Sequence, residues 1–215
     1  MKKGRGFGRM KILDNKKMKT FLFIDGTNLY AAQFELFGPE RYLDFPSFIK
    51  EIENKIKIKF DKIYFYASYT PKPKKISKKQ KRYIINEFKF YQSVKKTPKL
   101  TFFKGYRSKT SGKEKEVDVK LATDIVGYGL LNRYDTVYLM TGDADLLQAL
   151  FFIKKHNPKI KIKIICLDKK IMYKGAFYFD TFILNFSNQG LNFHPKQKIK
   201  IINIKNPAEL CQRVG

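Results

Sequence analysis

The stretch Phe21–Tyr30, FLFIDGTNLY, joins a short apolar run to an Asp-Gly pair. An apolar run that ends in Asp-Gly is typical of a buried strand followed by a turn. A second stretch, Thr136–Leu150, TVYLMTGDADLLQAL, repeats the arrangement and continues with helical spacing. The two stretches therefore predict two buried strands, each followed by a turn and a helix.

The same alternation of apolar runs and helical spacing continues along the chain. Strands that alternate with helices indicate an α/β fold whose mostly parallel sheet is covered by helices on both faces. Ligands of such sheets bind beyond the carboxyl ends of the strands, so the residues after each strand are the first site candidates. We expect further strands at 62–68, 100–104, 161–167 and 180–186, and further helices at 45–59, 77–96 and 117–131.

The length of 215 residues and the 43% of hydrophobic residues suit one domain with a packed core. Residues 1–19 are expected to form a basic, flexible N-terminal arm. Residues 20–187 carry the strand and helix pattern and form the predicted folded domain. Residues 188–215 are expected to be a C-terminal extension of unclear structure, in which KIKIINIK could add a strand.

The charge is strongly one-sided, with 45 Lys and Arg against 19 Asp and Glu and a net charge of +26. Such an excess repels itself and is not needed for folding, and its usual partner is nucleic acid or an anionic membrane. The membrane is the weaker candidate, because no strongly amphipathic basic helix stands apart from the predicted core. A genomic bias toward Lys, Ile, Asn, Phe and Tyr is an open alternative for part of the charge.

Cysteine and histidine usage argues against two kinds of site. Cys166 and Cys211 lie outside any CxxC pattern, and His156 and His194 are isolated, so neither a disulfide scaffold nor a zinc site is expected. No stretch approaches the ~20 apolar residues of a membrane span, and the N-terminus lacks the apolar core of a signal peptide. We therefore expect a cytoplasmic protein.

Four aspartates follow the predicted strands or open the helices after them: Asp25, Asp118, Asp143 and Asp145. Carboxylates gathered at one edge of a sheet repel one another unless a cation, a shared proton or many donors stabilise them. Mg²⁺ or Mn²⁺, which prefer oxygen ligands, is the simplest answer. Taken singly, each aspartate also fits an ordinary role: Asp25 and Asp143 as turn residues, and Asp118 and Asp145 as helix caps or as acids in the first turn of a helix.

One phosphatase family, the haloacid dehalogenases, also has an apolar strand followed by Asp-x-Asp-Gly-Thr, and the first Asp is its nucleophile. In this chain Phe23 holds that place. Phenylalanine cannot form an aspartyl phosphate, which excludes this reaction.

Three motifs in order, FLFIDGTNLY, KEVDVKLATDIV and VYLMTGDADLLQAL, resemble the NYN domain in its LabA-like branch of the PIN-like nucleases. The resemblance covers about residues 20–187, and FDTFILNFS resembles the closing strand, with Phe179 where a small residue is usual. It implies a three-layer α/β/α PIN-like (Rossmann-like) fold. It also implies hydrolysis of RNA phosphodiesters with Mg²⁺ or Mn²⁺.

Matched position by position, the resemblance assigns Asp25, Asp118, Asp143 and Asp145 to the catalytic, metal-binding acids. It assigns supporting roles to Asn28, which would steady Asp25 or contact substrate, and to Thr141. Asp124 and Asp180 match further acids of the family whose roles are less clear. For Asp124, a structural role as a hydrogen-bond acceptor is at least as good an interpretation as a supporting role in the site. Leu146 departs from the usual aromatic residue, which should alter packing more than chemistry.

Two basic runs are expected to bind the phosphate backbone of a nucleic acid. Such contacts set the affinity and its salt dependence, but they do not select a nucleotide sequence. Tyr69 and Tyr106 could stack on bases, although packing is the commoner role of such aromatics. The first run comprises Lys72, Lys74, Lys75, Lys78, Lys79, Lys81 and Arg82, and the second Lys104, Arg107, Lys109, Lys113, Lys115 and Lys120.

The sequence thus favours a metal-dependent ribonuclease in which the cation activates a water for attack on phosphorus. Neither His is placed as a general base, so carboxylates and metal must manage the proton. A non-catalytic RNA-binding module, the toxin of a toxin–antitoxin pair and a DNA substrate remain alternatives. The expected partner is RNA, single-stranded or structured. An acidic protein and a second copy of the chain remain possible further partners, and no membrane partner is expected.

Overall fold

The computed structural model describes residues 17–71, 75–107, 114–170, 173–186, 199–204 and 210–213. Seven strands form one sheet in the order β10-β9-β8-β7-β1-β3-β4, and all six neighbouring pairs are parallel. The predicted mostly parallel sheet is confirmed. Its strands are β1 (Thr20–Asp25), β3 (Lys62–Ala67), β4 (Leu100–Lys104), β7 (Thr136–Met140), β8 (Lys161–Leu167), β9 (Asp180–Asn185) and β10 (Ile199–Asn203).

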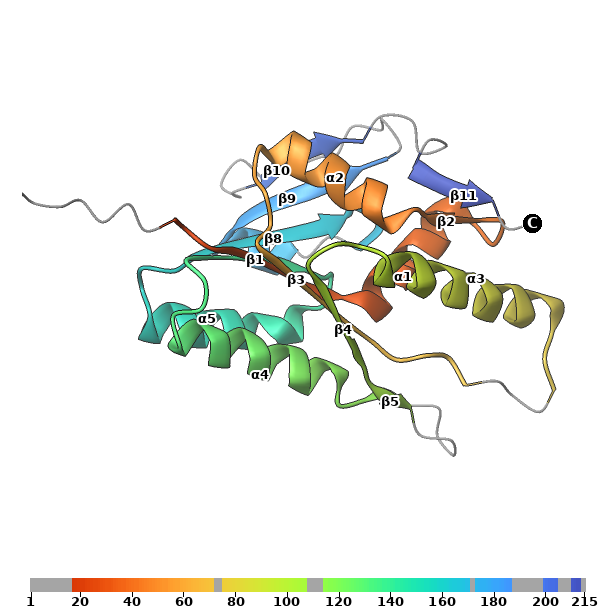
Figure 1. Ribbon diagram of the computed structural model, residues 1–215, viewed down its shortest axis with the longest axis horizontal. Helices are drawn as coiled ribbons and strands as arrows, with labels where there is room; N and C mark the ends of the chain where they lie inside the picture. The colour runs from red at the N-terminus through yellow and green to blue at the C-terminus, as the bar shows by residue number, and fades with distance from the viewer. Residues whose placement is uncertain are drawn as a thin grey trace, which may run out of the picture.

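Helices cover both faces of the sheet, so the predicted three-layer α/β architecture is confirmed (Figure 1). One face carries α1 (Gly26–Phe37), α2 (Phe45–Ile56) and α3 (Lys78–Lys95). The other carries α4 (Val117–Leu130) and α5 (Leu147–His156). None of these described helices has the length and apolar character needed to cross a membrane.

Short elements complete the described part of the chain. Two antiparallel pairs lie outside the main sheet: β2 (Arg41–Leu43) with β11 (Cys211–Arg213), and β5 (Tyr106–Arg107) with β6 (Glu114–Lys115). The short helices are η1 (Ala144–Leu146), η2 (Asp168–Lys170) and α6 (Tyr173–Ala176).

Strand β1 is buried on both faces because its side chains alternate between two cores. Leu22 and Ile24 belong to the cluster beneath α1, α2 and α3. Phe21 and Phe23 belong to the cluster beneath α4 and α5. Phe23 is fully buried and stacks on Tyr64, so the position that argued against phosphatase chemistry is a packing position.

The chain changes direction at β1, and this places a switch point between β1 and β7. From β1 the sheet grows through β3 to β4 on one side, and the chain then crosses to β7 and grows through β8, β9 and β10 on the other. Helices α1, α3 and α5 come after the parallel strands β1, β3 and β7, and α4 comes after β4 and the short β5–β6 pair, so all four begin at the carboxyl edge of the sheet. Ligands of open α/β sheets bind at such a switch point.

The stretch KIKIINIK supplies strand β10, which pairs with β9 and extends the sheet beyond residue 187. Ile202 and Ile204 are buried in the same core cluster as Leu22. Segment 199–204 is therefore part of the folded core. Most of the predicted N-terminal arm, residues 1–16, lies outside the described residues.

Two glycines give a matched test of the packing. A Cβ at Gly26, the first residue of α1, would overlap the buried Phe65 ring, whereas a Cβ at Gly127 in α4 meets nothing within 4 Å. We expect Gly26→Ala to lower the free energy of unfolding by about 1–3 kcal/mol through overpacking. Gly127→Ala should raise it by up to about 1 kcal/mol through helix propensity. Urea denaturation of both variants checks this, and equal stabilities would contradict the packing described.

Candidate active site

Asp25 ends strand β1 at the switch point and is only 5% exposed. It lies beside Tyr66 of β3 in the register, while its neighbour Ile24 pairs with Met140 of β7. The Asp25 side chain caps α1, because its Oδ1 accepts a hydrogen bond from the backbone N–H of Asn28 at 3.0 Å. The Asp-Gly pair of the sequence is therefore a strand end and a helix cap at once.

Thr141 joins the two acidic motifs. It directly follows β7, is 2% exposed, and its hydroxyl donates to Asp25 Oδ2 at 2.9 Å. The same hydroxyl oxygen accepts from the backbone N–H of Asp143 at 3.0 Å. One buried hydroxyl thus fixes the Asp25 carboxylate against the loop that carries Asp143.

Asn28 holds that loop from the other side. Its side-chain oxygen accepts from the backbone N–H of Gly142 at 3.0 Å. Gly142 itself lies against η2, where an added Cβ would come within 2.6 Å of the backbone oxygen of Lys170. A side chain would therefore push the loop away from Asn28, and glycine keeps it in place.

Asp143 and Asp145 form a local turn. Asp143 is the N-cap of η1, and its Oδ1 accepts from the backbone N–H of Asp145 at 2.9 Å. The capping role that the sequence left open for Asp145 thus falls to Asp143. The Asp145 side chain is exposed to solvent at the carboxyl edge.

Asp118 is the acidic residue in the first turn of α4, and it is exposed. Because α4 begins at the carboxyl edge, Asp118 lies at the same edge as Asp25 and Asp143. Glu116 precedes the helix in the left-handed conformation, with a φ of 75°, and makes no side-chain cap bond. The cap role considered for Asp118 is therefore not what the chain uses here; its place in the first turn suits the helix dipole.

Asp124 faces the sheet about two turns along α4. It accepts a hydrogen bond from the hydroxyl of Tyr66 at 2.8 Å and forms an ion pair with Lys120 at 2.6 Å. Burial, followed by the hydrogen bond to Asp124, raises the pKa of Tyr66, so its hydroxyl stays protonated as a donor. The sequence had no signal for Tyr66, because the partner of Asp124 comes from another strand.

Asp180 lies at the opposite edge of the sheet. It begins β9, so it sits at the amino end of that strand, and it pairs with Lys163 at 3.5 Å. His156 closes α5, also toward that edge, where its ring stacks on Phe152. His194 lies outside the described residues.

The donor set fits a hard divalent cation in its chemistry, since every candidate ligand is a carboxylate oxygen. Among the described residues no three His, Cys, Asp or Glu side chains form a group that could hold a metal ion. Capping still leaves room for a cation, because a carboxylate has about four lone-pair sites. Asp25 and Asp143 each use some of these sites for helix capping. A cation would therefore bind to acids whose positions are already fixed by the fold.

The basic residues divide into exposed and paired groups. Lys75, Lys78, Lys79 and Lys81 are exposed at or just before the start of α3, while Arg82 forms a 2.6 Å ion pair with Glu40. Lys120 forms an ion pair with Asp124. Arg107 and Lys115 form β5 and β6, but their side chains, like Lys72, Lys74, Lys109 and Lys113, lie outside the described residues.

The two candidate stacking residues differ in exposure. Tyr69 packs edge-to-face on Tyr91, and the ammonium groups of Lys95 and Lys104 lie 5.6 and 5.3 Å from its ring centre. Tyr106, in contrast, is 52% exposed beside the start of α4. Of these two candidates, Tyr106 is therefore the one whose ring is open to solvent.

Comparison with known proteins decides the family. The profile of the NYN domain matches residues 19–183, which is most of the chain. The chain belongs to the NYN domain family. Membership suggests a PIN-like nuclease, and the matched span includes all four candidate aspartates of this NYN chain.

A solved structure supports the fold. A protein of unknown function from Vibrio parahaemolyticus superimposes with a TM-score of 0.55 at 16% sequence identity, over 81% of this NYN chain and 96% of the other. At this identity the likeness concerns the fold alone, and it is consistent with a PIN-like fold. No curated protein shows significant similarity to the chain.

The hydroxyl of Thr141 can be tested by a matched pair of variants of this NYN domain. Thr141→Val keeps the shape but leaves Asp25 Oδ2 and the Asp143 N–H without this partner. Loss of a buried hydrogen bond to a charged group should lower the free energy of unfolding by about 1–3 kcal/mol. Thr141→Ser keeps the hydroxyl and should cost less than about 1 kcal/mol. Chemical denaturation that ranks the two variants equally would contradict the bridging role.

Proposed function

We propose that the chain is a metal-dependent ribonuclease of the LabA-like branch, with Asp25, Asp118, Asp143 and Asp145 as its acidic site. The observation that carries the proposal is the hydrogen-bonded unit of Asp25, Thr141 and Asp143 at the switch point between β1 and β7. A packed core does not need a charged group there. Burial of a carboxylate is costly, and such carboxylates are typical of functional sites.

In this proposal Asp25 and Asp143 are the principal ligands of Mg²⁺ or Mn²⁺, and Asp118 and Asp145 complete the set. A bound cation would lower the pKa of a water molecule and offset the negative charge of the phosphate. The chain contributes fixed geometry, because Asn28 and Thr141 hold the Asp25 oxygens before any ligand arrives. Positions fixed in advance avoid a cost of ordering during the reaction.

Proton transfer then depends on the carboxylates. The described histidine, His156, is bonded to the Phe152 carbonyl at the amino edge, far from the acids. Asp145 is exposed next to Asp143, and we assign the acceptance of the proton from the attacking water to the Asp145 carboxylate oxygen that would not bind the cation. Its exposure lets the proton pass on to solvent.

The substrate backbone would be held by the lysines at the start of α3 together with Lys104. These side chains are exposed on segments that follow β3 and end β4, so they flank the carboxyl edge where the acids lie. Exposed cations bind phosphate without reading sequence. Tyr106 adds an exposed ring on which an unpaired base could stack.

The first test is cleavage of labelled single-stranded RNA by Asp25→Asn and Asp143→Asn. Each should reduce the rate at least about 100-fold, because each removes a charged ligand from the site. The wild-type chain should cleave with Mn²⁺ or Mg²⁺ and not with EDTA, and a DNA strand of the same sequence tests the choice of sugar. Glu51→Gln on α2 is the control for the same chemical change in a surface pair. Cleavage unchanged in either Asp variant would refute the assignment, and RNA binding without cleavage would favour the non-catalytic alternative.

The second test concerns the lysines that would bind phosphate. In the Asp143→Asn background, Lys78→Ala combined with Lys79→Ala should weaken RNA binding and flatten its salt dependence. The slope of log K against log salt should fall by about 0.7 for each phosphate of a single strand that the variant no longer neutralises. Lys155→Ala combined with Lys159→Ala removes equal charge from the end of α5 and the following turn, at the opposite edge. Equal effects of the two pairs in a fluorescence titration would show that overall charge alone binds RNA.

A further inference from the structure

A cavity of about 420 Å³ lies at the amino edge of the sheet, at the opposite end of β1 from the aspartates. It is formed where β1 and β3 begin and where α4 ends. Six residues of β1 at ~3.3 Å each place it about 20 Å from Asp25. A cavity of this size falls within the usual range of small-molecule sites. Neither the family match nor the acidic site accounts for it.

Aromatic rings form one wall of this cavity. Tyr64 lies at the centre, with its ring 5.7 Å from Phe21 and 5.2 Å from Tyr128. Phe21 is buried, while Tyr64 and Tyr128 are half-buried and line the opening. Burial raises the pKa of Tyr64 to about 12, with the neighbouring Tyr128 as the next cause, so the hydroxyl remains a neutral hydrogen-bonding group. The wall is thus aromatic, with the rings of Phe21 and Tyr128 tilted by 53° and 36° against that of Tyr64, and it is polar only at the tyrosine hydroxyls.

Cationic side chains form the rim. Lys19, Lys62 and Arg133 line the cavity, and within the described residues no ion pair involves any of the three. Arg133 is close enough to Tyr64 to lower its pKa slightly against the effect of burial. Three such cations around one cavity favour an anionic ligand.

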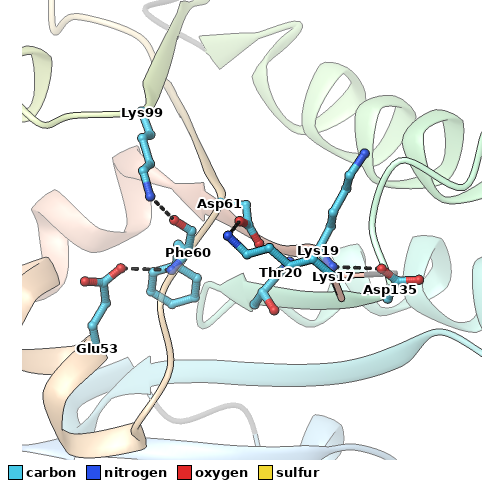
Figure 2. A network of polar contacts seen from close by, with 8 residues as sticks. All are labelled: Lys17, Lys19, Thr20, Glu53, Phe60, Asp61, Lys99 and Asp135. Carbon is cyan, nitrogen blue, oxygen red and sulfur yellow. Dashed lines mark hydrogen bonds and ion pairs between the residues drawn. The ribbon is translucent and has the colours of Figure 1, made fainter. Parts of the chain in front are cut away.

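The single carboxylate at the cavity, Asp61, is already engaged. Its Oδ2 accepts from the backbone N–H of Thr20 at 2.8 Å, and its Oδ1 faces Lys17 at 3.7 Å (Figure 2). Asp135 likewise fixes the backbone N–H of Lys19 at 2.7 Å (Figure 2). These bonds hold the two segments that carry the rim, and they leave the charge at the cavity positive.

The carboxyl end of α4 carries a partial negative charge, but that charge repels an anion in the cavity only weakly. The last carbonyls of the helix accept hydrogen bonds from the backbone N–H groups of residues 131–133. Leu131, which is 65% exposed, adds an apolar side chain at the opening. The negative end of the helix is therefore partly covered where the cavity opens.

We propose that this cavity binds a nucleotide, with the base against Tyr64 and Tyr128 and the phosphate on Lys62 and Arg133. Aromatic side chains beside these cations match the two halves of a nucleotide, a flat base and an anion. A peptide carboxylate would satisfy the cations and leave the aromatic wall without a partner. The nucleotide is either free or part of a single strand of nucleic acid that also reaches the carboxyl edge. The proposal stands independently of cleavage by the aspartates.

The chain contains no tryptophan, which allows a single-tryptophan reporter. Leu131→Trp places the indole at the opening without altering the aromatic wall, and Phe152→Trp, at an exposed position of α5, is the matched control. Titration with adenosine monophosphate should quench Leu131→Trp to saturation and leave Phe152→Trp unchanged. Adenosine and inorganic phosphate, each carrying half of the recognised group, should bind at least about tenfold more weakly.

Variants then test the assigned groups in the Leu131→Trp background. Lys62→Ala and Arg133→Ala should each weaken binding of adenosine monophosphate about tenfold, whereas Lys155→Ala should not change it. Far-UV circular dichroism and urea denaturation confirm that the variants are folded.

A second titration distinguishes a free nucleotide from a nucleotide within a strand. It uses the Leu131→Trp protein that also carries Asp143→Asn, a single-stranded RNA oligonucleotide as the ligand, and EDTA in the buffer. Quenching by the oligonucleotide at lower concentration than by the mononucleotide identifies the strand as the ligand, and the reverse identifies the free nucleotide. Absence of quenching by both, or quenching insensitive to Lys62→Ala and Arg133→Ala, would overturn the proposal.

Discussion

The buried carboxylate of Asp25 is the constraint on which the site depends. A charge removed from water requires fixed hydrogen-bond donors, because an unsatisfied buried carboxylate would cost several kcal/mol. The chain supplies the Asn28 N–H from the start of α1 and the Thr141 hydroxyl from the end of β7. Both residues also accept a hydrogen bond. The Asn28 side chain accepts from the Gly142 N–H, and the Thr141 oxygen accepts from the Asp143 N–H. One charge thereby sets the geometry of two loops from different strands.

The placement of positive charge follows from the same topology. Crossover helices in a parallel sheet begin at the carboxyl edge, so basic residues at a helix start lie at the same edge as the acids. Lys78, Lys79 and Lys81 occupy the first turns of α3 behind the Ser77 cap, where the helix dipole disfavours cations. Local stability therefore does not explain them, and a phosphate backbone that neutralises them would. Lys120 differs, because Asp124 already neutralises it.

The sequence predicted what depends on local pattern and missed what depends on pairing in space. Apolar runs located β1 and β7, and the Asp-Gly pair placed Asp25 at a strand end. The adjacency of β1 and β7 is set by strand order, which local periodicity does not encode. For the same reason the Thr141–Asp25 and Tyr66–Asp124 bonds, which span 116 and 58 residues, had no signal. The sequence left Asp145 open as a helix cap or a first-turn acid, because both roles suit an acid at the start of a helix. The backbone conformation selects Asp143 as the cap and leaves Asp145 in the first turn.

Helix α4 links the end of the molecule that carries the four candidate aspartates to the end that carries the aromatic cavity. Asp118 lies in its first turn, Tyr128 lies in its last, and 14 residues at 1.5 Å each separate the ends by about 21 Å, close to the length of β1. The helix is fixed at its far end, because Gly129 lets it approach α5 so closely that a Cβ there would overlap Ile153. The Tyr134 hydroxyl also donates to the Ile125 carbonyl at 2.6 Å. A close helix contact and a buried hydrogen bond leave little freedom for α4 to tilt. The acidic edge and the aromatic cavity are therefore held at a constant separation, so any strand that contacts both must span that distance without help from a movement of the protein.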